Sequence, residues 1–250
     1  MLVIWPTFYV VKNTFADGWD GITTALGDSD VISALQLSLI VAVSAVVINL
    51  VFGVGISLLL VRSDFPGKRL LSAFLDLPLA VSPVVVGLAL MLVYSPTYGW
   101  FGKPLDGVGI EIVFAKPAMI MATCFVALPL VIREIVPVLE EVGDDQEQAA
   151  QSLGASAWQT FWRVTLPSIK WAIIYGVVLS LARSLGEFGA VKVVSGNVTG
   201  ESQTATQLVQ AKYQGFEQTT AYVVAFLLAF ASVLCLAIVF GLRARGARHR

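Results

Sequence analysis

The sequence predicts an all-α integral membrane protein with six transmembrane helices, of which the first is short or truncated. Of its 250 residues, 57% are hydrophobic and only 13% are charged, whereas soluble domains average about 45–50% apolar and about 25% charged residues. The apolar residues form long runs, and the connectors between them carry Lys and Arg unevenly. These observations predict a single transmembrane domain over residues 1–250.

Five apolar runs are long enough to cross a bilayer, because a transmembrane helix needs about 20 apolar residues. They cover residues 34–61, 75–94, 117–138, 171–185 and 221–242. A sixth run, residues 1–11, is too short to cross alone, and we interpret it as the outer end of a first helix. A cleaved signal peptide is the alternative for this run, although no basic segment precedes it.

The distribution of basic residues predicts the orientation, because Lys and Arg prefer the cytoplasmic side of a membrane. They follow the second and the last of the six predicted spans: Arg62, Lys68, Arg69, Arg243, Arg245, Arg248 and Arg250. The segment before the second span is acidic instead. With six spans, both termini and the connector 139–167 are predicted to lie in the cytoplasm.

Prolines interrupt two of the predicted spans: Pro78 and Pro83 lie in or near the third, and Pro129 lies in the fourth. A proline inside a helix leaves a backbone carbonyl without its helical partner and kinks the helix. Membranes tolerate such carbonyls where protein or a water-filled path covers them. Pro129 is interpreted as an ordinary kink. For residues 77–83, which include Ser82, a kink and a pathway lining remain alternatives.

The connector 139–167 is a polar segment between two apolar runs, and its residue pattern predicts two short helices. Gly143 and Gly154 bracket the first helix. The residues that share one side of it are Gln146, Ala149, Ala150 and Leu153. Gly154 suits the left-handed conformation that ends a helix, and Ser156 is a suitable N-cap for a second helix over residues 157–163. Small alanines beside an apolar leucine favour docking into a groove on a partner. The alternative is an amphipathic helix on the membrane surface with no partner.

The spacing of this connector resembles the cytoplasmic coupling loop of ABC-importer permeases, in which a short helix docks into a groove on an ATPase. Two alanines, three residues, a glycine and nine residues lead to the final Val164-Thr165-Leu166-Pro167. The resemblance implies that these residues couple the chain to the ATPase: Glu147, Gln148, Ala149, Ala150, Leu153 and Gly154. Family members usually have Glu where this chain has Gln148, so a charged contact at position 148 is not carried over.

Further segments resemble the W-type permease subunit of bacterial sulfate/thiosulfate importers. They are residues 76–78, 81–85, 99–102, 133–137 and 182–196. Leu-Gly-Glu-Phe-Gly-Ala at 185–190 is also similar to molybdate permeases, whereas Val-Ser-Pro at 81–83 and Val-Val-Ser-Gly at 193–196 favour sulfate. The resemblance extends from about Phe52 to the last span.

The resemblance implies a multi-pass subunit of the bacterial inner membrane that works in a complex. Its partners are a second permease subunit (forming a heterodimer), a dimer of ATP-binding subunits, an extracytoplasmic sulfate-binding protein and the lipid bilayer. ATP and Mg are then used by the ATPase, and we expect no catalytic residue, cofactor, metal site or nucleic-acid partner on this chain. The absence of a Gly-x-x-x-x-Gly-Lys-Ser/Thr phosphate loop from the sequence agrees with this expectation.

Sulfate is a dianion, and moving a bare ion into hydrocarbon costs tens of kcal/mol, so a sulfate permease needs a hydrated, polar path. The candidate lining residues are Ser82, Ser180, Arg183, Ser184 and Glu187. An ionisable residue inside a span suggests a functional role. Arg183 and Glu187 are four residues apart and are expected to pair on one helix face; the alternative is that Arg183 contacts the anion directly.

Three other functions remain as alternatives. The first is a permease of a molybdate or tungstate ABC importer. The second is an ion-coupled secondary transporter, for which Glu187 is the one good carboxylate relay. The third is a membrane enzyme in which Asp144-Asp145-x-Glu147 binds Mg²⁺-diphosphate, although no second acidic cluster faces this one.

Overall fold

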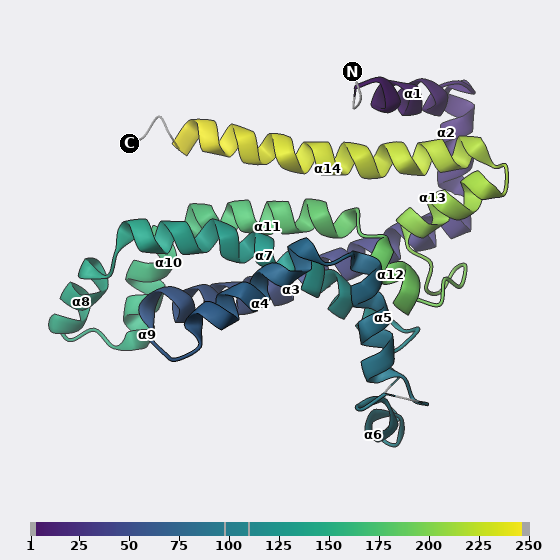
Figure 1. Cartoon of the computed structure of the whole chain (residues 1–250). Helices are drawn as coiled ribbons and strands as arrows, with labels where there is room; N and C mark the ends of the chain where they lie inside the picture. The colour runs from purple at the N-terminus through teal and green to yellow at the C-terminus, as the bar shows by residue number, and fades with distance from the viewer. Residues whose placement is uncertain (1–3, 98, 110, 247–250) are drawn as a thin grey trace.

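The computed structural model describes residues 4–97, 99–109 and 111–246 (Figure 1), and every regular element in this part is a helix. The elements are α1 (Ile4–Thr14), α2 (Gly18–Gly27), α3 (Ser29–Arg62), α4 (Lys68–Ala80), α5 (Pro83–Tyr94), α6 (Gly102–Asp106), α7 (Lys116–Val142), α8 (Asp145–Ser152), α9 (Ala157–Thr160), the π-helix η1 (Phe161–Thr165), α10 (Leu166–Ser168), α11 (Lys170–Leu185), α12 (Gly189–Val194), α13 (Ala205–Gln214) and α14 (Gln218–Gly246).

Three described helices are long and apolar enough to cross a membrane by themselves: α3, α7, and α14 over Gln218–Gly241. They contain the predicted runs 34–61 and 117–138 and most of the run 221–242. Two bent helix pairs raise the number to five if each pair is one span. α1 has 11 residues, which is too short to cross a bilayer. The structure thus supports an all-helical membrane domain, and the sixth span stays a prediction.

The apolar run 75–94, which suggested one span, forms two helices. α4 and α5 meet at an angle of 113°. Between them Val81 and Ser82 are extended, with ψ angles of 139° and 133°. Pro83 explains the position of the break, because a proline disfavours the helical conformation of the residue before it. Pro78 stays inside α4, so only one of the two prolines breaks the chain direction.

Small residues let the central helices α3, α7 and α11 approach closely around Val131. A Cβ atom on Gly53 of α3 would lie 2.7 Å from Cγ1 of Val131. A Cβ atom on Gly176 of α11 would lie 3.1 Å from Cα of the same valine. Close backbone approach through small residues is typical of helix packing in membranes. The packing around Val131 continues through a buried apolar cluster that includes Ile135, Leu139 and Ile169.

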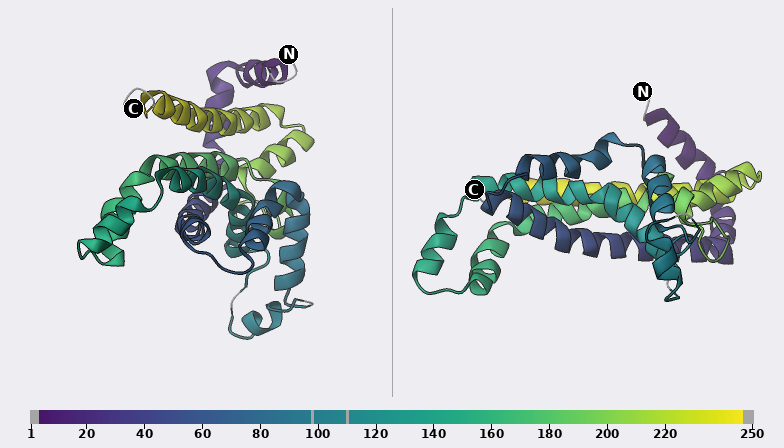
Figure 2. Two further views of the ribbon diagram at one scale, coloured as in Figure 1. Left: turned by 60° about the vertical axis from the view of Figure 1, so that its left-hand side comes forward. Right: turned by 60° about the horizontal axis from the view of Figure 1, so that its bottom comes forward.

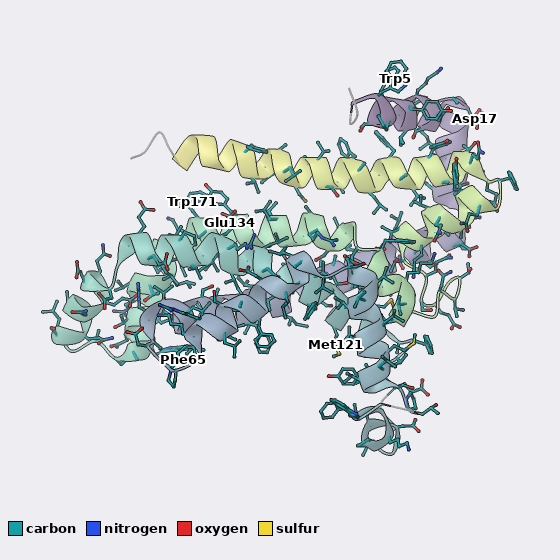
Figure 3. All side chains as sticks on the ribbon, in the orientation of Figure 1. Trp5, Asp17, Phe65, Met121, Glu134 and Trp171 are labelled. Carbon is teal, nitrogen blue, oxygen red and sulfur yellow. The ribbon has the colours of Figure 1, made fainter. Side chains whose placement is uncertain are left out.

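The long helices run side by side, so the connecting elements gather at two ends of the molecule. Figure 1 places α8, α9 and α10 at one end together with the end of α14, and α2, α12 and α13 toward the other; the right-hand view of Figure 2 shows the same division. Side-chain oxygen and nitrogen atoms concentrate at these two ends, whereas α14 carries mostly carbon (Figure 3). Only 17% of the apolar window of α14 is buried within the chain, as expected for a helix that faces lipid or another subunit.

Candidate coupling site and translocation segments

The polar connector folds into two short helices, and a glycine motif ends the first. In α8, Gln148 Nε2 donates to Asp144 Oδ2 at 2.8 Å. Gly154 follows with φ 89°. The N–H of Gly154 donates to the carbonyl of Gln151 at 2.9 Å, and that of Ala155 donates to Ala150 at 3.0 Å. This pair of hydrogen bonds around a left-handed glycine is the Schellman motif, so the predicted role of Gly154 at the helix end is confirmed.

The second helix begins at the predicted N-cap. Ser156 Oγ accepts from the N–H of Gln159 at 3.3 Å, and Gln159 Oε1 accepts from the N–H of Ser156 at 2.9 Å. This capping box satisfies two backbone donors at the start of α9. The helix was expected over residues 157–163 but continues as η1 up to Thr165. The wider π turn directly precedes Pro167, whose ring would clash with the carbonyl four residues earlier in a regular α-helix.

The two helices present an exposed apolar surface. Leu153 is 90% exposed, and Trp158 and Trp162 are also exposed. Ala149 is exposed, whereas Ala150 is partly covered by the chain itself. Of the residues assigned to docking, Gln148, Ala149, Leu153 and Gly154 are exposed, whereas Glu147 and Ala150 are partly covered.

Glu147 points toward the spans and is held within the chain. Its carboxylate accepts two hydrogen bonds from Arg62: Nε to Oε2 at 3.0 Å, and Nη2 to Oε1 at 3.3 Å. Thr165 Oγ1 also donates to Oε1 at 2.8 Å. A bidentate pair between guanidinium and carboxylate is the strongest common arrangement of these groups. Glu147 thus braces α8 against α3 and η1.

Arg62 also binds the end of α7. Its Nη1 donates to the carbonyl of Leu139 at 3.2 Å, and its Nη2 donates to the carbonyl of Gly143 at 2.6 Å. The carbonyl of Leu139 also accepts from the N–H of Gly143, whereas that of Gly143 lies beyond the helix. Carbonyls at the C-terminal end of a helix carry partial negative charge, so a cation is favourable there. We refer to Arg62, Leu139, Gly143, Glu147 and Thr165 as the Arg62 clamp. The sequence marked Arg62 only as an orientation signal.

The predicted ion pair in the fifth apolar run is present. Arg183 Nη1 lies 2.6 Å from Glu187 Oε2, although the N–H does not point at this oxygen as in a hydrogen bond. The side chain of Glu187 is 2% exposed, and its Oε1 accepts from the N–H of Ala190 at 3.0 Å. Glu187 therefore neutralises Arg183 and also binds the first turn of α12.

The candidate serines divide between two environments. Ser180 and Ser184 are buried in α11, and the hydroxyl of neither has a hydrogen-bond partner among the described residues. Ser82 is exposed at the break between α4 and α5. This break lies beside the start of α12, because a Cβ atom on Gly189 would be 3.2 Å from Cβ of Pro83. The break thus adjoins α12, and the first turn of α12 also binds Glu187.

A second ion pair lies between apolar stretches and was not predicted as a site. Arg133 of α7 donates to Asp76 of α4 at 2.9 Å. In the sequence 57 positions separate the two residues, so their spacing gave no sign of the pair. Within the part of the chain that the structure describes, no group of three or more His, Cys, Asp or Glu residues could hold a metal ion.

Comparison with known proteins decides the family. Residues 50–248 match the family described as binding-protein-dependent transport system inner membrane component. The chain belongs to this permease family. As such it is a membrane subunit of an ABC transport system of the inner membrane and is not itself the catalytic subunit.

The permease is similar over its full length to curated relatives. It is 46% identical over 249 residues to the sulfate transport system permease protein CysW of Synechococcus elongatus, covering 100% of this chain and 87% of that protein. It is 42% identical to CysW of Synechocystis sp., covering 100% of this chain and 90% of the relative. To CysW of Escherichia coli K12 it is 41% identical, with coverages of 94% and 80%.

Solved structures show the same fold. The permease superposes with a TM-score of 0.77 on a chain of a bacterial ABC transporter involved in import of the acidic polysaccharide alginate, covering 98% of this chain and 90% of that chain. The sequence identity is 18%, so this similarity concerns the fold alone.

Proposed function

We propose that this permease is the W-type subunit of a sulfate/thiosulfate ABC importer, with both termini in the cytoplasm. The observation that carries the proposal is its similarity, at 41–46% identity, to three CysW sulfate permeases over most or all of each chain. The chain is also 36% identical to the sulfate transport system permease protein CysT of Escherichia coli K12. Two such related permeases would form the heterodimer that encloses the translocation path.

The proposed energy source is a dimer of ATP-binding subunits that uses ATP and Mg and docks on α8 and α9. The exposed Ala149 and Leu153, and the rigid turn at Gly154, support this docking site. In this proposal Ala150 and Gln148 lie at the edge of the contact. Glu147 serves it indirectly, because the Arg62 clamp transmits movement of α8 to α3 and α7.

The proposed path for the anion adjoins α11, α12 and the break between α4 and α5. Ser82, Ser180 and Ser184 supply hydroxyl groups, and Arg183 supplies positive charge that Glu187 balances. An extracytoplasmic sulfate-binding protein would deliver the anion at the end that carries α12 and α13. In support, a solved relative of the fold is an alginate transporter in complex with a periplasmic protein, with a TM-score of 0.75 at 18% identity.

Uptake by the reconstituted complex tests this proposal. The four-subunit membrane complex in vesicles, supplied with the binding protein and internal ATP, should accumulate labelled sulfate, and excess molybdate should compete weakly. Accumulation of molybdate but not sulfate would identify the other oxyanion importer. Sulfate uptake that needs an ion gradient but no ATP would identify a secondary transporter instead.

A further inference from the structure

The ion pair between Asp76 and Arg133 lies inside apolar segments. Arg133 is nine residues before the end of α7, and Asp76 is eight residues after the start of α4. At about 1.5 Å per residue, both side chains are roughly 12–14 Å from the helix ends at which α7 leads into α8 and α4 begins. Exposed apolar residues of α4 lie near Asp76, among them Phe74, Leu77 and Leu79, together with the exposed polar Ser72 one turn before it.

Both charged side chains are open on the surface of this chain. The side chain of Arg133 is 59% exposed and that of Asp76 is 54% exposed. Lipid on this side would place two charges against hydrocarbon, which is unfavourable. Pro78 also leaves the carbonyl of Phe74 without a helical donor, and such carbonyls are tolerated where protein or water covers them. Coverage of this face of α4 by another subunit, across a water-filled space, would accommodate both the two charges and the free carbonyl.

The geometry of the pair leaves donors unused. Nε and Nη2 of Arg133 both donate to the same oxygen, Asp76 Oδ1, at 3.2 and 2.9 Å. Among the described residues, no other group accepts a hydrogen bond from Arg133, so its Nη1 edge remains available. A planar guanidinium binds oxyanions through two parallel N–H groups. A tetrahedral oxyanion can therefore bind Arg133 without first displacing Asp76.

Arg133 differs in this respect from Arg183. The partner of Arg183 is the buried Glu187, which is also fixed by the N–H of Ala190. The described contacts hold Asp76 only through Arg133, so Asp76 can move aside at little cost. The contacts of Glu187 thus favour a permanent ion pair with Arg183, whereas those of Asp76 allow Arg133 to exchange one partner for another.

We propose that Arg133 binds the tetrahedral dianion during its passage, and that Asp76 holds and neutralises the guanidinium between transport events. This inference rests on the proposed function, since it assigns an anion contact to the same path. It adds a contact on α7 to the path residues named above. If the ion pair served structure alone, loss of either partner would reduce sulfate uptake equally. If Arg133 contacts the anion, uptake depends mainly on Arg133.

The first test measures sulfate uptake and ATP hydrolysis by the assembled complex. Arg133→Gln should lower uptake by about tenfold or more, since a charge-assisted contact to the anion is lost, while ATP hydrolysis continues. Asp76→Asn should keep sulfate uptake within about threefold of the wild-type rate. This change is well below the fold-change in uptake expected from loss of one charge-assisted contact to the anion. Lys68→Gln, which removes an exposed ion pair at the start of α4, is the matched control and should change little. Equal losses for Arg133→Gln and Asp76→Asn would overturn the inference.

The second test begins with Arg133 in place, so its first result does not depend on the folding of the Gln variant. In a complex whose Cys124 and Cys235 are replaced by Ala, Asp76→Cys should react faster with an anionic methanethiosulfonate than with a cationic one. Sulfate should slow the reaction, and adding Arg133→Gln should abolish the preference. Equal or faster reaction of the cationic reagent, or no reaction, would overturn the inference. A wild-type complex that takes up no oxyanion would overturn the proposed function as well, whereas normal sulfate uptake by Arg133→Gln would overturn the inference alone.

Discussion

The guanidinium of Arg62 and the carboxylate of Glu147 form a bidentate ion pair, although 85 positions separate them in the sequence. Arg62 is the last residue of α3, and its remaining donors bind the carbonyls that end α7. The polar helix α8 is thus fixed to the ends of two membrane-spanning helices. A force applied to α8 by a partner would reach α3 and α7 through this contact.

Arg62→Gln is expected to uncouple ATP hydrolysis from uptake. The change strands the carboxylate of Glu147, and the lost charge-assisted hydrogen bonds contribute about 1.5–3 kcal/mol. The number of sulfate ions taken up per ATP hydrolysed by the complex should fall. Thr165→Val removes a single hydrogen bond to Glu147 and leaves the ion pair in place, so it should uncouple less than Arg62→Gln. An unchanged ratio in Arg62→Gln would show that the Arg62 clamp does not transmit movement.

Gly154→Val is expected to displace α9 and weaken assembly with the ATPase. The φ of 89° at Gly154 is strained for any L side chain, at about 1–2 kcal/mol, and more for a β-branched one. A Cβ atom there would meet no other atom within 4 Å, so the effect is conformational and not steric. Gly154→Asn, which tolerates this conformation better, is the matched control. Co-purification with the ATPase and labelled sulfate uptake measure the outcome; equal retention by both variants would contradict the prediction.

Leu153→Asp is expected to abolish docking without destabilising the permease. Leu153 is almost fully exposed, so its replacement removes no contact within the chain. A charge would oppose burial in an apolar groove of the ATPase. The melting temperature of the purified permease should stay unchanged while the ATPase no longer co-purifies. Gln151→Asp, on an exposed neighbouring position of α8, controls for added charge, and normal co-purification of Leu153→Asp would exclude this face as the docking surface.

Features set by neighbours in sequence could be predicted, and features set by helix packing could not. The left-handed Gly154, the N-cap Ser156 and the pair Arg183–Glu187 each involve residues at most five positions apart. The pairs Arg62–Glu147 and Asp76–Arg133 depend on which helices lie side by side. Their members are far apart in the sequence, so no local pattern of residues predicts these pairs.

The break between α4 and α5 is an intermediate case. Pro83 indicated an interruption of the helix. The residues on both sides of it are apolar and no polar connector separates them, so hydropathy indicated a single span. The 113° bend depends on the packing of α5 against α12, where a Cβ atom on Gly87 would lie 2.6 Å from the carbonyl oxygen of Ala190. At Pro83 the direction of the chain thus depends on contacts with residues about 100 positions later in the sequence.

The contact between Asp28 and Lys212 predicts a dependence of stability on pH. The N–H of Asp30 lowers the pKa of Asp28 below its ordinary 3.8, and Lys212 helps. The hydrogen bond to Glu217 raises the pKa of Lys212 above 10.5, and Asp28 adds to this effect. The contribution of Asp28 is present above pH 3.8 and is lost as pH falls through its lowered pKa. That of Lys212 is present below pH 10.5 and is lost as pH rises through its raised pKa.

Asp28→Asn should therefore lower the melting temperature of the permease at neutral pH. The difference in melting temperature from the wild type should disappear in acid, below the lowered pKa of Asp28. There the protonated Asp28 of the wild type is neutral, as is the amide that replaces it in the variant. Asp20→Asn, at an exposed position of α2, is the control. A difference between Asp28→Asn and wild type that stays constant from neutral pH into acid would assign the effect to packing instead of charge.

Double substitution of Arg183 and Glu187 separates pairing from anion binding. Arg183→Ala strands a carboxylate that is 2% exposed, and breaking a buried pair in this way costs about 3–5 kcal/mol. Adding Glu187→Gln removes the stranded charge, and the amide oxygen can still accept from the N–H of Ala190. This double variant should recover more stability and uptake than Arg183→Ala combined with Glu187→Ala, which also loses the contact to α12. Melting temperature and labelled sulfate uptake are measured for each variant. If stability recovers in the Arg183→Ala/Glu187→Gln complex but uptake does not, Arg183 contacts the anion directly; if neither recovers, the ion pair does not account for the loss in Arg183→Ala.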